Sequence, residues 1–198
     1  MINITINGTE VQVPEGTTIL QAARQADIRI PTLCYIEKYA PLGACRVCLV
    51  EVEGARSLVA SCATPVAEGM KVQTHSSRVR DARRKVVELL LSEHNGDCQT
   101  CDRNRDCELQ ALAWELGIMS SPWAGETTAG ETDYTTPALV RDSNKCIKCR
   151  RCVTVCQEVQ SVGSIQPQGR GFETRIGPAF NRGLDSVACV QCGQCGAV

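Results

Sequence analysis

Three groups of cysteines, one of them joined by a histidine, carry the residue types and spacings that could do chemistry in this sequence. The chain has 198 residues, of which fourteen are cysteine and two are histidine. Thiolates and imidazoles are ligands of zinc and of iron-sulfur clusters. The first question is therefore which of these side chains share one metal centre.

The first group consists of four cysteines with the spacing C-x10-C-x2-C-x13-C, namely Cys34, Cys45, Cys48 and Cys62. Plant-type ferredoxins hold a 2Fe-2S cluster with C-x4-C-x2-C and a distant fourth cysteine. The first gap is longer here, but the C-x2-C pair and the distant cysteine remain. We predict a 2Fe-2S cluster. A zinc ion, which four thiolates also bind tetrahedrally, is the alternative.

The second group has the spacing H-x3-C-x2-C-x5-C and consists of His94, Cys98, Cys101 and Cys107. A lone histidine at a helix end is usually a capping or solvated residue, but this one begins a compact run of polar turn residues. A neutral imidazole in place of a thiolate makes a cluster less negative and raises its potential. We predict a 4Fe-4S cluster held by one histidine and three cysteines.

The third group is the most specific of the three. Its first run, C-x2-C-x2-C-x3-C, is repeated in its first three positions by a second run, and the members are Cys146, Cys149, Cys152, Cys156, Cys189, Cys192 and Cys195. In two-cluster bacterial ferredoxins the fourth cysteine of each run ligates the cluster of the other run. Cys156 should therefore join the second run. Gln157 replaces the proline that usually follows the fourth cysteine.

A count of ligands tests this scheme. Four clusters with four protein ligands each need sixteen, and fourteen cysteines plus His94 provide fifteen. The absent ligand is the fourth one of the cluster on Cys146, Cys149 and Cys152, which a cysteine at position 199 would supply. We therefore expect the sequence to be the N-terminal part of a longer subunit. A naturally short chain with one three-ligand cluster is the alternative.

The sequence also indicates the cellular location of the protein. The N-terminus has no signal-peptide pattern and no segment approaches the roughly 20 apolar residues of a membrane span. A cytoplasmic location without a membrane span follows, where thiols stay reduced and serve as metal ligands and not as disulfides. The net charge of -1 argues against nucleic acid as a partner.

The hydrophobic pattern places these groups on small modules. Ile2, Ile4 and Ile6, then Asn7-Gly8, then Val11 and Val13 predict a hairpin, and Thr17 or Thr18 should cap a helix. Strands are expected at 47–52 and 71–74, and helices from 78 onward and at 108–116. The predicted domains are 1–77, 78–120 and 138–198, with a linker at 121–137 that is rich in Gly, Thr, Glu and Pro.

Two sets of basic residues border the cysteine groups. Arg78, Arg80, Arg83, Arg84 and Lys85 share a helix whose buried stripe should contain Val79, Ala82, Val86 and Leu90. A solvated helix face is the first interpretation, and a docking patch for an acidic carrier such as a ferredoxin is the alternative. Around the third group lie Lys145, Lys148, Arg150 and Arg151, which are either solvated or offset the negative clusters.

The order of the three groups resembles the N-terminal half of the catalytic subunits of multimeric, NAD(P)-linked FeFe hydrogenases, some of them electron-bifurcating. The stretches KCIKCRRCVTVCQEVQSVGSI, GRGFETRIGPAF and CVQCGQC are similar to that family. The resemblance implies an α+β fold with a beta-grasp 2Fe-2S domain, a small helical 4Fe-4S domain and a two-cluster ferredoxin-like domain. It implies one 2Fe-2S and three 4Fe-4S clusters.

The resemblance also implies a role and partners. The chain would relay electrons between an NADH-oxidising flavin subunit, a small 2Fe-2S subunit and a hydrogen-activating site outside these residues. No catalytic residue, flavin site or nicotinamide site is expected here, because Gly169-Arg170-Gly171 is a lone G-x-G that we interpret as a turn. Large subunits of NADH dehydrogenase and of some formate dehydrogenases share this front end. A zinc-stapled binding module is the alternative from a different class.

Overall fold

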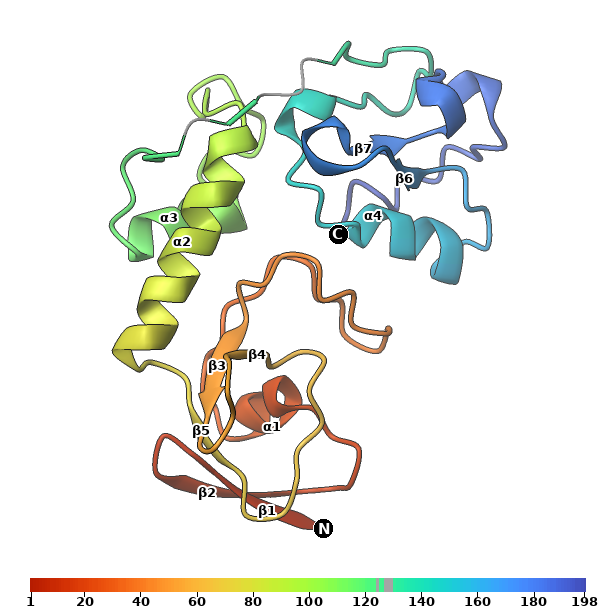
Figure 1. Cartoon of the computed structure of the whole chain (residues 1–198). Helices are drawn as coiled ribbons and strands as arrows, with labels where there is room; N and C mark the ends of the chain where they lie inside the picture. The colour runs from red at the N-terminus through yellow and green to blue at the C-terminus, as the bar shows by residue number, and fades with distance from the viewer. Residues whose placement is uncertain (124, 127–129) are drawn as a thin grey trace. The chain divides into compact units, whose positions relative to one another are not determined.

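Two compact units make up the described part of the chain. The computed structural model describes residues 1–123, 125–126 and 130–198. One unit comprises residues 1–88 and 107–119, and the other comprises 89–106 and 120–198 (Figure 1). The predicted domain boundaries differ from this division and stay predictions.

The first unit starts with the predicted hairpin. Strands β1 (Ile2–Ile6) and β2 (Thr9–Val13) pair antiparallel. Asn7 and Gly8 both have positive φ, 53° and 89°, as a primed two-residue turn requires. Ile4 and Ile6 are buried, so the alternation in the sequence correctly gives the face that packs on the core.

The hairpin belongs to a mixed sheet of five strands in the order β2-β1-β5-β3-β4. Strand β5 (Lys71–Gln73) runs parallel to β1, and β3 (Leu49–Val52) runs antiparallel both to β5 and to the short β4 (Val59–Ala60). The sequence did not predict β4. Strand β3 begins two residues later than predicted, because residues 47 and 48 form part of the turn in the first cysteine group.

One helix packs on this sheet. Helix α1 (Ile19–Gln25) begins after Thr18, whose side chain forms a capping box with Gln21. Its apolar side contributes Ile19 and Leu20 to the core, together with two alanines. The same core includes the buried Cys48 and Cys62, so the first cysteine group is anchored directly on packed structure.

Helix α2 (Ser77–Glu93) corrects one prediction. Val79 and Val87 are fully buried, and between them lies Arg83, which is only 4% exposed. Ala82, Val86 and Leu90 are half-buried. The prediction that Arg83 lies on a solvated face is therefore wrong. Its guanidinium finds backbone acceptors inside the unit, which the apolar pattern alone could not indicate.

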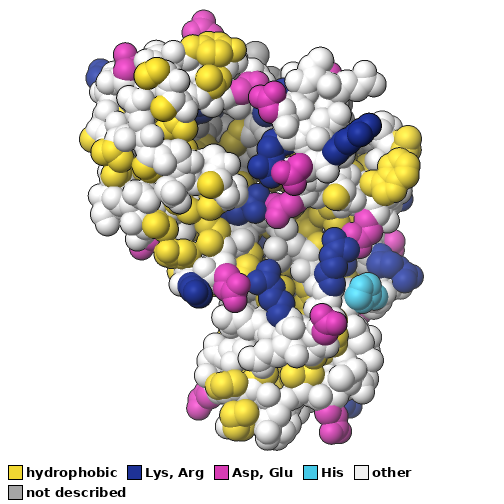
Figure 2. Space-filling model, turned by 180° about the vertical axis from the view of Figure 1, so that it is seen from behind, with side chains coloured by type: hydrophobic (Ala, Val, Ile, Leu, Met, Phe, Trp, Pro, Cys, Tyr) yellow, Lys and Arg dark blue, Asp and Glu magenta, His cyan; other side chains and the backbone are white. Residues whose placement is uncertain are grey.

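The remaining members of that basic run do not form a patch of one sign. Arg78 pairs with Glu51 at 3.5 Å and Arg84 pairs with Glu88 at 2.9 Å. Figure 2 shows Lys and Arg side chains interspersed with Asp and Glu on the face in view. Because both arginines are paired with acidic side chains, they offer an acidic partner little excess positive charge.

The second predicted helix in this region also forms. Helix α3 (Glu108–Glu115) starts after Cys107 and buries Leu109, Leu112 and Ala113. None of the helices in the described ranges is both long and apolar enough to cross a membrane.

The second unit has little regular structure. Helix α4 (Arg151–Thr154) continues into a π-helical turn at Val155–Val159, and β6 (Gln166–Gln168) pairs antiparallel with β7 (Arg175–Gly177). Gly169 and Gly171 lie in the connection between these strands with positive φ. Short 3-10 turns occur at Ser143–Lys145, Gly171–Glu173, Ala179–Asn181 and Leu184–Ser186.

Part of the predicted linker 121–137 is packed. Residues 124 and 127–129 lie outside the described residues. Asp133 is buried, forms a bridge with Arg141, and accepts hydrogen bonds from the backbone N–H groups of Thr135 and Leu184, both at 3.0 Å. Burial raises the pKa of Asp133, but the bonds from Thr135 and Leu184 and the charge of Arg141 outweigh it and lower the pKa.

We expect Asp133→Ala to destabilise the second unit by about 1–3 kcal/mol, because it leaves buried donors unsatisfied. Since the folded pKa of Asp133 is lowered, its contribution is present at neutral pH and is lost as the pH falls through the folded pKa. The variant should therefore lose less stability on acidification than the parent. Thermal unfolding across pH checks this, with the exposed Glu131→Ala as control. Equal stability of the two variants would contradict it.

Candidate metal centres

The four thiols of the first cysteine group are all buried and lie in pairs. Cys48 Sγ is 3.4 Å from Cys62 Sγ, and Cys34 is hydrogen-bonded to Cys45. A 2Fe-2S cluster has two irons, each of which takes two thiolates, whereas one zinc ion needs all four sulfurs around a single point. The pairing fits the two-iron group.

Each pair contains one thiol that ionises easily. A hydrogen bond from Cys45 lowers the pKa of Cys34 to about 6, and one from Cys62 lowers the pKa of Cys48 to about 6, in both cases against the effect of burial. The pKa values of Cys45 and Cys62 are raised, because each is paired with one of these thiolates. A metal ligand must be a thiolate, so the site is prepared for a cation.

The sheet brings the second pair together. Cys48 directly precedes β3 and Cys62 follows β4 after one residue, and the two strands are paired through Leu49 and Ala60. The backbone N–H of Ser61 donates to the carbonyl of Cys48 at 3.1 Å. The unpredicted strand β4 is thus the element that positions the distant fourth cysteine.

The second group begins where α2 ends. His94 Nδ1 is buried and has no hydrogen-bond partner among the described residues. Burial lowers the pKa of His94, and the nearby charge of Lys145 lowers it further. A neutral imidazole with an unpartnered nitrogen is in the state that a metal ligand requires. Cys98 and Cys101 follow in tight turns of the same unit, whereas Cys107 belongs to the first unit.

The cysteines of the third group influence one another, both within the two predicted sets and between them. Burial raises the pKa of Cys152 to about 12, and the charges of Cys149, Cys146 and Cys195 raise it further. Burial likewise raises the pKa of Cys195, with additional contributions that come from Cys192, Cys189 and Cys156. Thiols that repel one another as anions need a cation among them, which fits iron as the group they hold.

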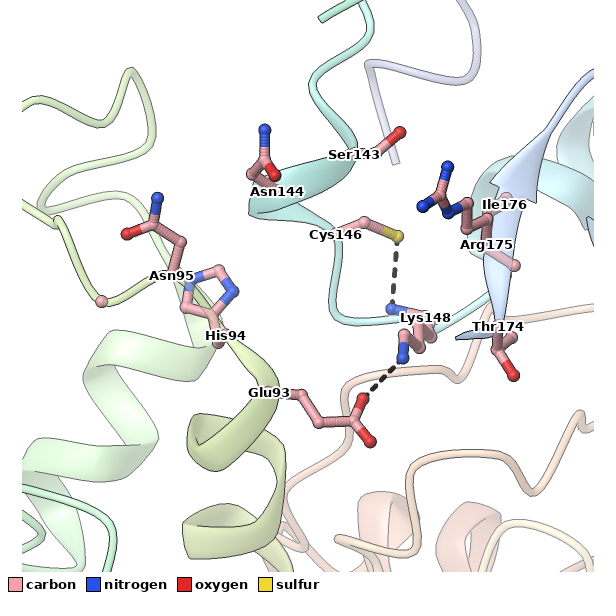
Figure 3. A pocket seen from close by; sticks show the side chains of 11 residues that line it. Glu93, His94, Asn95, Ser143, Asn144, Cys146, Lys148, Thr174, Arg175 and Ile176 are labelled. Carbon is pink, nitrogen blue, oxygen red and sulfur yellow. Dashed lines mark hydrogen bonds and ion pairs between the residues drawn. The ribbon is translucent and has the colours of Figure 1, made fainter. Parts of the chain in front are cut away.

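A cavity of about 430 Å³ within the second unit is lined by His94 of the second group and by Cys146 of the third (Figure 3). Lys148 extends along it, with its backbone N–H 3.3 Å from Cys146 Sγ and its Nζ 2.6 Å from Glu93 Oε2. Lys148, which lies beside Cys146, is therefore ion-paired with Glu93, which directly precedes His94 in the chain. The sequence identified Lys148 as a charge near the third group but did not identify Glu93 as its partner.

Arg83 is the other residue near a candidate site that sequence analysis missed. Its side chain donates hydrogen bonds to the carbonyl oxygens of Val47 and Leu49, on either side of Cys48. Its spacing of four residues from both Val79 and Val87 is a signal that could have identified it as buried.

Buried thiol pairs, an unpartnered imidazole and clustered cysteines on short loops define an iron-sulfur protein. Comparison with known proteins agrees. Residues 1–77 match the family described as 2Fe-2S iron-sulfur cluster binding domain, and residues 83–122 match the NADH-ubiquinone oxidoreductase-G iron-sulfur binding region. The chain belongs to the family of iron-sulfur proteins related to NADH-ubiquinone oxidoreductase-G.

Individual relatives extend the match over almost all of the chain. NADP-reducing hydrogenase subunit HndD of Solidesulfovibrio fructosivorans is 48% identical over 100% of this chain and 35% of its own length. NADPH-Fe(3+) oxidoreductase subunit alpha of Geobacter sulfurreducens is 38% identical over 98% of this chain and 23% of its own. The chain thus spans about a third or less of these curated relatives.

A solved structure is similar in fold as well as in sequence. A chain of an NAD+-reducing [NiFe]-hydrogenase in the H2-reduced state superposes with a TM-score of 0.87 at 31% identity. The match covers 95% of this chain and 80% of that one. The relatives that share this iron-sulfur region thus include a subunit named for an NADP-reducing hydrogenase and a chain of an NAD+-reducing [NiFe]-hydrogenase.

Proposed function

We propose that this chain is a multi-cluster electron relay in an NAD(P)-linked hydrogenase complex. The observation that carries the proposal is the pairing of four buried thiols in the first unit, which matches the two irons of a 2Fe-2S cluster. Iron-sulfur clusters, when bound, take up and release single electrons. The role of the chain's own residues is to hold them and to set their potentials.

The ligand assignment is part of this proposal. The 2Fe-2S cluster would take Cys34, Cys45, Cys48 and Cys62, and the first 4Fe-4S cluster would take His94, Cys98, Cys101 and Cys107. A second 4Fe-4S cluster would take Cys146, Cys149 and Cys152. The third would take Cys156, Cys189, Cys192 and Cys195. The domains would be those predicted from the sequence, with a beta-grasp fold in the first.

The relatives support the choice of complex. The 48% identity to a subunit named as an NADP-reducing hydrogenase favours a hydrogenase, and the motif order favours the FeFe type. Partners would be a flavin subunit that oxidises NADH and a small 2Fe-2S subunit. A relay in an NADH dehydrogenase is the second candidate, because residues 83–122 match a region described for that enzyme. Formate dehydrogenase is a further candidate by resemblance of the cysteine groups.

Metal analysis of the anaerobically purified chain tests the class. We expect about fourteen irons per chain, or about ten where the cluster with three protein ligands is lost, together with acid-labile sulfide. EPR of the reduced protein should show both two-iron and four-iron signals. A colourless, redox-silent protein that contains zinc would support a zinc-stapled binding module and overturn the proposal.

His94→Cys tests the imidazole ligand. A thiolate in place of the neutral imidazole makes the cluster more negative, so its midpoint potential should fall while its iron content is kept. His94→Ala should lower the iron content of that cluster alone. The measurement is an EPR-monitored redox titration, with His75→Ala as control. An unchanged midpoint in His94→Cys would remove His94 from the ligand set.

Lys148 and Glu93 test whether charge beside the third group sets its potential. Lys148→Gln removes a positive charge next to Cys146 and should lower the midpoint of the cluster held there. Glu93→Gln frees that charge from its ion pair and should raise the same midpoint. Redox titration of both variants, with exposed Glu131→Gln as control, checks the opposite signs. Shifts of the same sign would show that the ion pair acts through structure.

A further inference from the structure

Arg83 is a buried cation that forms no ion pair with another described residue. It is 4% exposed, and none of the ion pairs found among the described residues includes it. A buried charge is strongly unfavourable unless it is paired or well hydrogen-bonded. Some feature of the first unit must therefore offset the free-energy cost of burying this guanidinium.

Part of the compensation comes from backbone carbonyl groups. Arg83 Nε donates to Val47 O at 3.0 Å, and Nη2 donates to Leu49 O at 3.1 Å and to Thr74 O at 3.4 Å. Val47 and Leu49 are the two neighbours of Cys48 in the chain. The planar fork of an arginine suits such a set of acceptors, whereas a lysine offers only a point charge.

These contacts fix the loop that carries two candidate ligands. Val47 lies between Cys45 and Cys48, and Leu49 begins strand β3. Thr74 follows β5 and is itself held by Asn7, whose Oδ1 accepts from the Thr74 N–H at 2.9 Å. Arg83 thus connects the ligand loop to the central strands of the sheet.

Two negative charges add to the compensation from the carbonyl groups. Burial lowers the pKa of Arg83, while the negative charges of Glu115 and Cys48 act to raise it. The four thiolates of a 2Fe-2S site carry more negative charge than the positive charge of the core of two irons and two sulfides. The site is therefore negative overall, and one-electron reduction adds one more negative charge. A fixed cation beside Cys48 is the electrostatic partner that such a site needs.

We propose that Arg83 is a positioning residue of the 2Fe-2S site, which clamps the Cys45–Cys48 loop and serves as the buried counter-charge of the cluster. This inference rests on the proposed function, because it requires that the first cysteine group holds the cluster. The cation stabilises the reduced, more negative state over the oxidised one. It therefore raises the reduction potential of the site.

The test is a redox titration of the full chain, with the 2Fe-2S component followed by EPR and visible circular dichroism. Arg83→Met should make reduction at least tenfold less favourable, which is a shift of about 59 mV to more negative potential for a one-electron couple. Arg83→Lys keeps the charge and should shift it by clearly less. Arg80→Met removes the same charge from an exposed position of the same helix and should leave the midpoint unchanged.

Each outcome decides the inference. A midpoint in Arg83→Met equal to that of the parent or of Arg80→Met overturns it. Where Arg83→Met does not retain the cluster, retention in Arg83→Lys supports the need for a cation, and loss in both variants overturns the counter-charge role. A parent chain without any 2Fe-2S signal would instead refute the proposed function, so the two failures are distinguishable.

Discussion

Repulsion between closely placed thiolates is the constraint on which the rest of this structure depends. Fourteen cysteines are gathered on short loops and on one short helical segment, and each group must be stable enough to fold before or while a cation binds. The first unit meets this constraint by pairing its thiols, so that in each pair one proton is shared and one thiolate, Cys34 or Cys48, is favoured. It adds a buried guanidinium at the backbone beside Cys48. The second unit has no comparable apolar core among its described residues, and the pKa values of its half-buried thiols Cys152 and Cys195 are raised.

The same constraint explains the backbone of the ligand loops. Non-glycine residues with left-handed φ occur inside the C-x2-C turns, at Arg46, Lys148, Arg150 and Gln191. Such a conformation costs about 1–3 kcal/mol per residue and persists only where the surroundings demand it. At Lys148 the reason for the left-handed conformation is that it directs the backbone N–H toward Cys146 Sγ. The strain at Lys148 is therefore offset by a hydrogen bond to sulfur, which favours the ionised ligand.

Much of the first unit follows from its sequence, whereas the second unit does not. Alternating Ile2, Ile4 and Ile6 with a following Asn-Gly define the hairpin, because period and turn chemistry are local properties. The two-residue strand β4 and the pair β6 and β7 have too few residues to produce a period, and tertiary contacts alone create them. The prediction that Arg83 is exposed was wrong for a related reason. A charged residue is expected on the surface unless its hydrogen-bond partners are known, and the partners of Arg83 are carbonyl groups that are distant in sequence. The grouping of the cysteines stays a prediction, which rests on the fact that the spacing of ligands is constrained by the geometry of the group they bind. The contact between the thiols of Cys48 and Cys62 depends on the pairing of β3 with β4, which the sequence did not predict.

The helical segment formed by α4 and the following π-helical turn carries both Cys152 and Cys156. Under the proposed assignment these residues belong to different clusters. Four residues of helix rise by about 6 Å, so the separation of the two anchoring points is set by covalent and hydrogen-bonded geometry within one short segment. The tunnelling distance between neighbouring centres is then insulated from changes elsewhere in the chain. Substitutions on the surrounding loops can therefore adjust the driving force of each electron transfer without changing the spacing that governs its rate.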